Sequence, residues 1–198
     1  MIIGIMGKAG SGKDAICFKI INRLEEDFTC EQYAFADSLK EVISEIYSIR
    51  SPLTWTRDFK ENGKIDIRTN LVTDEECSEN VLTIRQLLQK VGTSMQHVLH
   101  PNVWINNVFN KIYKDTSFNI ITDVRFKHEY KAVKSRDGIL IRVINPSLES
   151  KDGHISENDV DDLPVDYTII NNWKEDPEGV EKQIDELVQQ ITNEYRSN

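Results

Sequence analysis

Residues Gly7 to Lys13 match the pattern G-x-x-x-x-G-K. The motif follows an apolar run, Ile2 to Met6, and precedes an apolar-periodic stretch from Asp14 to about Leu24, so a strand, a tight loop and a helix are expected. Glycines let such a loop curl around phosphates and present N–H donors at a helix N-terminus, while Lys13 adds a positive charge. The pattern predicts a phosphate-binding loop, and a glycine-rich turn with an incidental lysine is the alternative.

Asp14 stands where this motif usually has serine or threonine, whose hydroxyl contacts Mg²⁺. A carboxylate can do the same, directly or through a water, because Mg²⁺ prefers oxygen ligands. Capping of the helix N-terminus is the alternative role of Asp14, and the two roles are compatible.

A short apolar strand is expected at Phe118 to Thr122, and Asp123 follows it. An apolar strand that ends in an acid is the form expected of the second phosphate and metal element in such proteins. Asp123 could instead only cap the helix that follows. Arg125 and Glu129 beside it favour a functional site.

Three lysines, Lys127, Lys131 and Lys134, fall at helical spacing just after this strand. A solvated helix face is the common explanation of such spacing, but the lysines could also cover bound phosphates. The two readings stay open.

Strands alternate with helices along the chain, which predicts an α/β fold with a central parallel sheet and helices on both faces. Further strands are expected at 31–35, 139–144 and 167–170, and helices at 38–49, from 84 onward, after Pro101 to about Lys114, at 126–136 and across 180–191. Residues 50–80 break the pattern. Such a long irregular stretch is usually a functional loop, a lid or an insertion.

Composition limits the class of protein. The 198 residues are 39% hydrophobic and 29% charged, as in an ordinary folded domain, and the net charge of −9 argues against a nucleic-acid polymer as partner. Neither a signal peptide nor a membrane span is expected, so a cytoplasmic protein is predicted. The three cysteines and four histidines show no metal-ligand spacing.

Seven segments together resemble the bacteriophage-type deoxynucleoside monophosphate kinases, over nearly the whole chain except residues 50–80. They are Gly7–Asp14, Ala34–Lys40, Arg85–Thr93, Trp104–Asn106, Thr122–Glu129, His154–Glu157 and Asp166–Asn172. The resemblance implies a single domain, 1–198, with the three-layer P-loop NTPase fold and helical lid and acceptor-binding insertions. Residues 50–80 would be a variable insertion, and about 126–160 a lid-like region.

The resemblance also implies that the protein transfers the γ-phosphoryl group of ATP to a dNMP with Mg²⁺. Catalysis would rest on Lys13, Asp123 and Arg125, and the metal on Asp14 and Asp123. The ATP site would comprise Gly7, Gly10, Ser11, Gly12, Lys13, Asp14 and Ala15, where Ala15 replaces a threonine frequent in the family. If the chain is encoded by a phage, it would act in the host cytoplasm.

The acceptor site implied by the resemblance comprises Asp37, Lys40, Arg85, Gln89, Gly92, Thr93, Trp104 and Glu129. An arginine suits a phosphate, and amide and aromatic groups suit a base. Core packing at a helix start is the alternative for Trp104.

Two rival functions remain at this point: another small-molecule P-loop kinase, resembling phosphomevalonate kinases, and a nucleotide-binding switch. The Arg85–Thr93 and Asp123–Glu129 segments favour a nucleotide acceptor over the first. The absence of an Asn-Lys-x-Asp motif argues against the second. The accepted dNMPs and the oligomeric state stay open, with a homodimer as one option.

Overall fold

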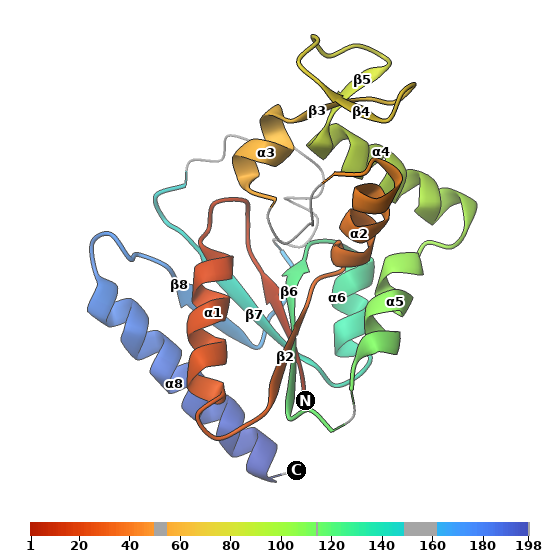
Figure 1. The fold of residues 1–198 in the computed structure, drawn as a ribbon. Coiled ribbons are helices and arrows are strands. Elements are labelled where there is room, and N and C mark those ends of the chain that lie inside the picture. The colour runs from red at the N-terminus through yellow and green to blue at the C-terminus, as the bar shows by residue number, and fades with distance from the viewer. Residues whose placement is uncertain (50–54, 114, 149–161, 198) are drawn as a thin grey trace. The chain divides into compact units, whose positions relative to one another are not determined.

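A computed structural model describes residues 1–49, 55–113, 115–148 and 162–197 (Figure 1). The chain forms two compact units, Met1–Ala34 with Lys111–Asn198, and Phe35–Asn110. The first unit is called the sheet unit here and the second the helical unit. The single kinase domain expected over 1–198 stays a prediction.

Among the described residues, the sheet unit has one sheet of five strands, and each pairing between them is parallel, as expected of a β-α-β sequence pattern. Their order is β2-β6-β1-β7-β8. The bounds are β1 Ile2–Met6, β2 Cys30–Tyr33, β6 Phe118–Val124, β7 Ile139–Ile144 and β8 Tyr167–Ile170.

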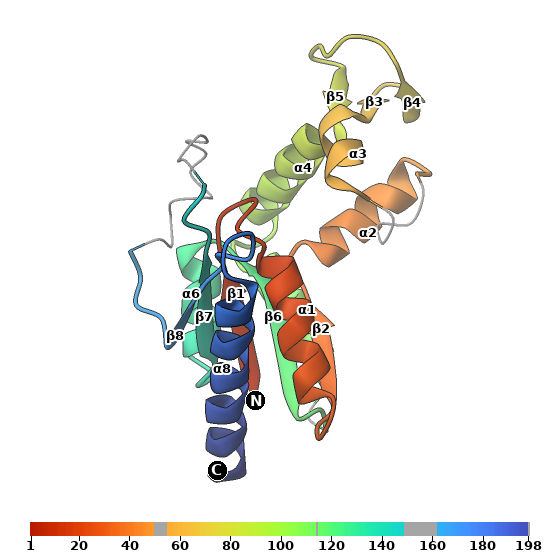
Figure 2. The same ribbon diagram turned by 90° about the vertical axis from the view of Figure 1, so that its left-hand side faces the viewer.

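Helices cover both faces of this sheet (Figure 2). On one face, α1 (Lys13–Leu24) and α8 (Pro177–Ser197) share a buried core with Ile3 and Ile5 of β1. On the other face, Val133 of α6 (Lys127–Lys134) lies against Gly4. Because side chains alternate along a strand, Gly4 points away from the face that Ile3 and Ile5 occupy. The predicted α/β fold with helices on both faces is confirmed.

Strands β1 and β6 are neighbours, and Met6 at the end of β1 pairs with Val124 at the end of β6. The segments that follow the two strands therefore leave the sheet at the same edge. In open parallel sheets, ligands bind outside this carboxyl edge.

The helical unit contains four helices and a small antiparallel sheet of order β4-β3-β5 within the described residues. Its buried core includes Leu39, Ile43, Ile65, Leu87 and Trp104. The helices are α2 Asp37–Ile46, α3 Arg57–Asn62, α4 Ile84–Val98 and α5 Val103–Lys111, and the strands are β3 Lys64–Asp66, β4 Leu71–Thr73 and β5 Val81–Thr83.

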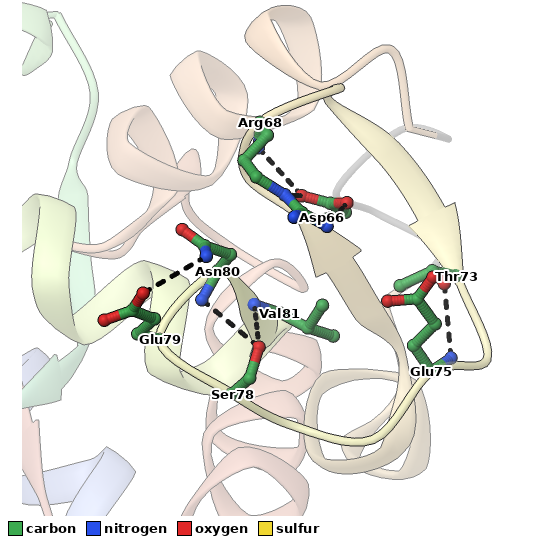
Figure 3. Close-up of polar contacts among 8 residues, drawn as sticks. All are labelled: Asp66, Arg68, Thr73, Glu75, Ser78, Glu79, Asn80 and Val81. Atoms are coloured by element: carbon green, nitrogen blue, oxygen red, sulfur yellow. Dashed lines mark hydrogen bonds and ion pairs between the residues drawn. The ribbon is translucent and has the colours of Figure 1, made fainter.

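The expectation of an irregular stretch over 50–80 is wrong for the described residues 55–80, which contain α3, β3 and β4. Side chains hold the turns between the strands (Figure 3). Asp66 accepts hydrogen bonds from the Arg68 backbone at 2.9 Å and from its guanidinium at 2.6 Å, and the Ser78 hydroxyl accepts from the Val81 N–H at 3.2 Å. Strands of three residues are too short to show an alternating pattern, so the sequence could not reveal them.

Part of the lid-like region expected at about 126–160 belongs to the sheet unit, as helix α6 and strand β7. Residues 149–161, with the His154–Glu157 segment, lie outside the described residues, as does Lys114. A lid function stays a prediction. No helix among the described residues is long and apolar enough to cross a membrane.

Candidate active site

The loop between β1 and α1 has the geometry expected of a phosphate-binding loop. Gly10 and Gly12 have φ angles of 82° and 79°, in the left-handed region that favours glycine. The Ser11 N–H donates to the Lys8 carbonyl at 3.0 Å, and the Gly12 carbonyl accepts from the Ile16 N–H at 3.0 Å and so begins α1. Alternating backbone conformations of this kind turn successive N–H groups into an anion-binding concavity.

Lys13 is the first residue of α1 and is only 8% exposed. Its ammonium group donates to Asp14 Oδ1 at 2.5 Å, while the Asp14 side chain is 82% exposed. The helix N-cap is Gly12, without a side-chain cap, so Asp14 does not cap the helix. Asp14 keeps a carboxylate in the first turn, where the helix dipole favours negative charge. Ala15 is exposed beside it.

Two polar atoms buried at this loop have no hydrogen-bond partner within the part of the chain that the structure describes: Ser11 Oγ and Asn171 Oδ1. Asn171 follows β8, and its Nδ2 donates to the Ser11 carbonyl at 2.7 Å. In the sequence, Asn171 belongs to the family-like segment Asp166–Asn172, from which no role for it was predicted. Its contact joins residues 160 positions apart, which local spacing cannot reveal.

At the end of the neighbouring strand, Asp123 and Arg125 precede α6. Glu129, for which the family resemblance implies an acceptor-site role, is 6% exposed, and its carboxylate points back to this turn. Its carboxylate accepts hydrogen bonds from the N–H groups of Arg125 at 2.7 Å and Phe126 at 3.1 Å. Glu129 therefore holds the backbone between Asp123 and α6, in the geometry of a capping residue.

The pKa of Glu129 is raised to about 8. Burial is the main cause, and the negative charge of Asp123 adds to it. The hydrogen bonds from the Arg125 and Phe126 backbones and the charge of Arg125 act in the opposite direction. The carboxyl group is therefore protonated at a pH at which an exposed glutamate is ionised.

Lys134, one of the three lysines on α6, contacts the residues that directly precede β7 and β8. Its ammonium group donates to the Gly138 carbonyl at 3.2 Å and to Asp166 at 3.0 Å. All three lysines are exposed. Covering of phosphates by these lysines stays a prediction.

The predicted acceptor residues at the start of α2 contact each other. The Lys40 ammonium group donates to Asp37 Oδ1 at 2.7 Å across one helical turn. Half of the Asp37 side-chain surface and a quarter of that of Lys40 are exposed. Both groups can thus be reached by a ligand of the helical unit.

Helix α4 places Arg85 and Gln89 one turn apart. Arg85 forms an ion pair with Glu61 of α3 at 3.2 Å, and both side chains are about 40% exposed. Gln89 and Thr93 line an open groove of about 490 Å³, together with Leu82, Gln86, Lys90 and Ser94. The structure therefore brings Gln89 and Thr93 together on a surface accessible to a ligand.

The other two predicted acceptor residues of this unit lie in the packed part. Trp104 is buried in the core, and its indole N–H donates to the Gly92 carbonyl at 3.3 Å. Gly92 is also buried, and a Cβ atom there would lie 2.9 Å from Leu39 Cδ2, so α2 and α4 pack closely at this point. The contacts of Trp104 are those of a core residue. A contact between Trp104 and a base stays a prediction.

The acidic residues near the phosphate-binding loop fit a metal ion that arrives with a nucleotide. The described residues contain no group of three or more His, Cys, Asp or Glu side chains that could hold a metal ion. Mg²⁺ at phosphotransfer sites usually needs only one or two carboxylates, because phosphates and waters complete its oxygen shell. Asp14 and Asp123 are of that type and number.

A parallel sheet with this loop after β1 and an acid at the end of the adjacent β6 defines a P-loop protein that handles nucleotide phosphates. The sequence profile described as deoxynucleotide monophosphate kinase matches residues 54–177, more than half of the chain. The chain belongs to the deoxynucleotide monophosphate kinase family, and it is a kinase. The matched range begins after the phosphate-binding loop, so the profile and the loop are independent observations.

Curated relatives agree with this assignment. A protein of Acanthamoeba polyphaga mimivirus, provisionally named a deoxynucleotide monophosphate kinase, is 29% identical, with 96% of this chain and 94% of the relative covered. The deoxynucleoside-5'-monophosphate kinase of Escherichia phage T5 is 24% identical, covering 87% and 90%. The deoxynucleotide monophosphate kinase of Enterobacteria phage T4 is 24% identical over 62% of this chain and 55% of its own. Among solved structures, a plasmid partition protein of Borrelia burgdorferi has a TM-score of 0.40 at 12% identity, with 98% of each chain covered.

Proposed function

We propose that the protein transfers the γ-phosphoryl group of ATP to a dNMP and releases ADP and a dNDP. The observation that carries the proposal is the loop after β1, where two left-handed glycines precede a nearly buried lysine at the N-terminus of α1. Such a loop binds the phosphates of a nucleoside triphosphate. Membership of the family supplies the acceptor class.

On the donor side, the loop N–H groups from Gly7 to Lys13 bind the ATP phosphates, and Lys13 stabilises the negative charge that develops during transfer. Asp14 and Asp123 hold Mg²⁺, which when bound supplies further positive charge to the phosphates. Arg125 lies in the turn that Glu129 holds, and its side chain binds the phosphoryl group that is transferred. Glu129 acts on the backbone of this turn rather than on the substrate, because its carboxyl group is buried and hydrogen-bonded there.

On the acceptor side, Arg85 exchanges its ion pair with Glu61 for the phosphate of the dNMP. Gln89 and Thr93, which line the open groove, contribute hydrogen bonds to the acceptor. Asp37 and Lys40 bind polar groups of the nucleoside and its phosphate. Gly92 and Trp104 support this side by the packing of α4. A cytoplasmic location and a homodimer remain predictions.

An ATP-coupled assay with purified protein tests the proposal. The acceptors are the four dNMPs, the corresponding ribonucleotides and phosphomevalonate, with and without Mg²⁺. We expect ADP and a dNDP in equal amounts from at least one dNMP, and only with Mg²⁺. A folded protein that phosphorylates no nucleoside monophosphate would contradict the proposal, and ATP hydrolysis without a dNDP would favour a switch.

A further inference from the structure

Asn171 connects the end of β8 to the phosphate-binding loop. Its backbone N–H donates to the Ile144 carbonyl at 2.6 Å, which fixes the residue to the end of β7. From there its Nδ2 donates to the Ser11 carbonyl at 2.7 Å. Since a carbonyl oxygen can only accept, the amide nitrogen must face Ser11.

The same side chain lies directly against Gly12. A Cβ atom built on Gly12 would lie 2.2 Å from Asn171 Nδ2, a separation that non-bonded atoms do not adopt. Two features therefore disfavour any side chain at position 12: the φ angle of 79° at Gly12 and the close approach of the Asn171 amide. The amide and the glycine fit each other.

The hydrogen bond to the Ser11 carbonyl also fixes the direction of the Gly12 N–H group. Ser11 C=O and Gly12 N–H belong to one planar trans peptide, in which the two bonds point in opposite directions. When Asn171 holds the carbonyl on its side, the Gly12 N–H must point away from Asn171. A phosphate-binding loop depends on the direction of such N–H groups.

Within the residues that the structure describes, the oxygen atom of the Asn171 amide makes no hydrogen bond that would account for an asparagine at this position. Asn171 Oδ1 is buried and has no partner among the described residues, which is costly for a polar atom. In the described part of the chain, the side-chain amide of Asn171 is therefore held by its hydrogen bond to the Ser11 carbonyl.

We propose that Asn171 is a positioning residue for ATP binding: by holding the Ser11 carbonyl, its amide group orients the Gly12 N–H toward the nucleotide phosphates. The inference rests on the proposed function, because it assigns ATP to this loop. Asn171 touches neither the reacting atoms nor the dNMP. Its loss therefore affects ATP binding more than acceptor binding.

Calorimetric titration of the full chain with Mg²⁺ and a non-hydrolysable ATP analogue tests the proposal. We expect Asn171→Ala to weaken the affinity for the analogue by about tenfold, as for loss of one hydrogen bond that orders a binding loop. Asn171→Asp has the same shape but cannot donate to the Ser11 carbonyl, and should weaken the affinity at least as much. The KM of the dNMP should change little in both variants.

Gln183→Ala is the matched control. The Gln183 amide accepts from the Ile170 N–H at 2.9 Å and donates to the Ile170 carbonyl at 3.3 Å, so it supports the same end of β8 without contacting the loop. We expect its affinity for the analogue to equal that of the wild type. Equal affinity losses in Gln183→Ala and Asn171→Ala would overturn the proposal, because strand support alone would then account for both.

Lys13→Ala separates failure of this inference from failure of the proposed function. If the wild type binds no ATP analogue, the proposed function is wrong. If the wild type binds it, Lys13→Ala weakens binding, and both folded Asn171 variants bind as the wild type does, only the inference is wrong. Thermal melting of each variant shows whether it is folded, and a misfolded Asn171→Ala leaves Asn171→Asp to decide.

Discussion

At the scale of single residues, Lys13 combines burial with charge. A lysine that is only 8% exposed has lost most of its hydration and is paired with the exposed carboxylate of Asp14. Bound phosphates would take the place of the lost water and of the Asp14 carboxylate as partners of the Lys13 ammonium group. A fixed cation in a largely water-excluded place stabilises developing negative charge more than a mobile one in water does.

We therefore predict that Lys13→Ala lowers kcat by roughly a hundredfold or more with the fold intact. Steady-state kinetics with saturating ATP and dNMP measure the loss, and circular dichroism verifies folding. The surface variant Lys182→Ala, on α8, should keep normal kcat. A folded Lys13→Ala protein with near wild-type turnover would show that Lys13 does not act on the reacting phosphates.

The substitution Asp14→Asn tests whether Asp14 contributes to Mg²⁺ binding. Asparagine keeps the size of the side chain and an oxygen that can accept from Lys13, but it removes the negative charge that attracts Mg²⁺. The expected result is a severalfold higher Mg²⁺ concentration at half-maximal activity, with an unchanged melting temperature. Magnesium titrations of the two proteins at fixed ATP provide the comparison. Coincident titrations would leave Asp14 with an electrostatic role in the first turn of α1 only.

At the scale of elements, the ion pair between α3 and α4 offers a clear test of the acceptor site. A partly exposed pair such as Arg85 with Glu61 is worth no more than about 1 kcal/mol, so its loss alone should not disturb catalysis. An arginine that binds a phosphate dianion contributes much more to affinity.

Arg85→Ala should raise the KM for the dNMP by roughly tenfold or more, with ATP affinity unchanged. Glu61→Gln is the matched control: it breaks the same ion pair but leaves the guanidinium group available, so the KM should stay the same or fall. Kinetics with varied dNMP and ATP binding without acceptor are the two measurements. Similar effects of the two variants would show that Arg85 serves only to join α3 and α4.

The sequence predicted elements well where the apolar pattern was long or strongly periodic. The strand at 2–6 and the helix α1 were expected close to their observed bounds, α4 begins at the expected residue, and the apolar stripe expected at 180–191 lies within the longer helix α8. The three-residue strands β3, β4 and β5 were missed because no pattern develops over so few residues, and their turns depend on contacts such as Asp66 with Arg68.

For the site, the sequence predicted the phosphate-binding loop because all its parts are adjacent in the chain. It could not predict that Glu129 would turn inward to the Arg125 backbone, since burial is a property of the packed helix α6. Nor could it predict the role of Asn171, whose partner lies at the other end of the chain. The remaining roles in donor and acceptor binding stay predictions.

At the scale of the whole molecule, the buried Glu129 links stability to pH. Its pKa is about 8 in the folded protein against an ordinary value of 4.5. The folded state therefore keeps a proton that the unfolded state releases, so this group's contribution to stability is fully present below about pH 4.5 and is lost as the pH rises toward 8.

Glu129→Gln removes this titration while keeping an oxygen for the Arg125 and Phe126 N–H groups. We predict that the melting temperature of the wild type falls, relative to that of Glu129→Gln, as the pH rises from 5 to 8. Melting curves across this range measure the difference, with the exposed-residue variant Glu178→Gln as control. A difference that is constant with pH would show that Glu129 is already ionised in the folded protein at pH 5.

The sheet unit is made of two separate stretches of chain, with the helical unit between them. During synthesis, which proceeds from the N-terminus, β1 and α1 leave the ribosome long before β6, β7, β8 and α8. The helical unit is one continuous stretch, Phe35–Asn110, and is made in the meantime. In the described part of the chain, β1 pairs in parallel with β6 and β7, and both strands are made after the helical unit. A nascent chain therefore carries the complete phosphate-binding sequence without its supporting sheet, and a chain halted before residue 171 also lacks the amide that holds the loop.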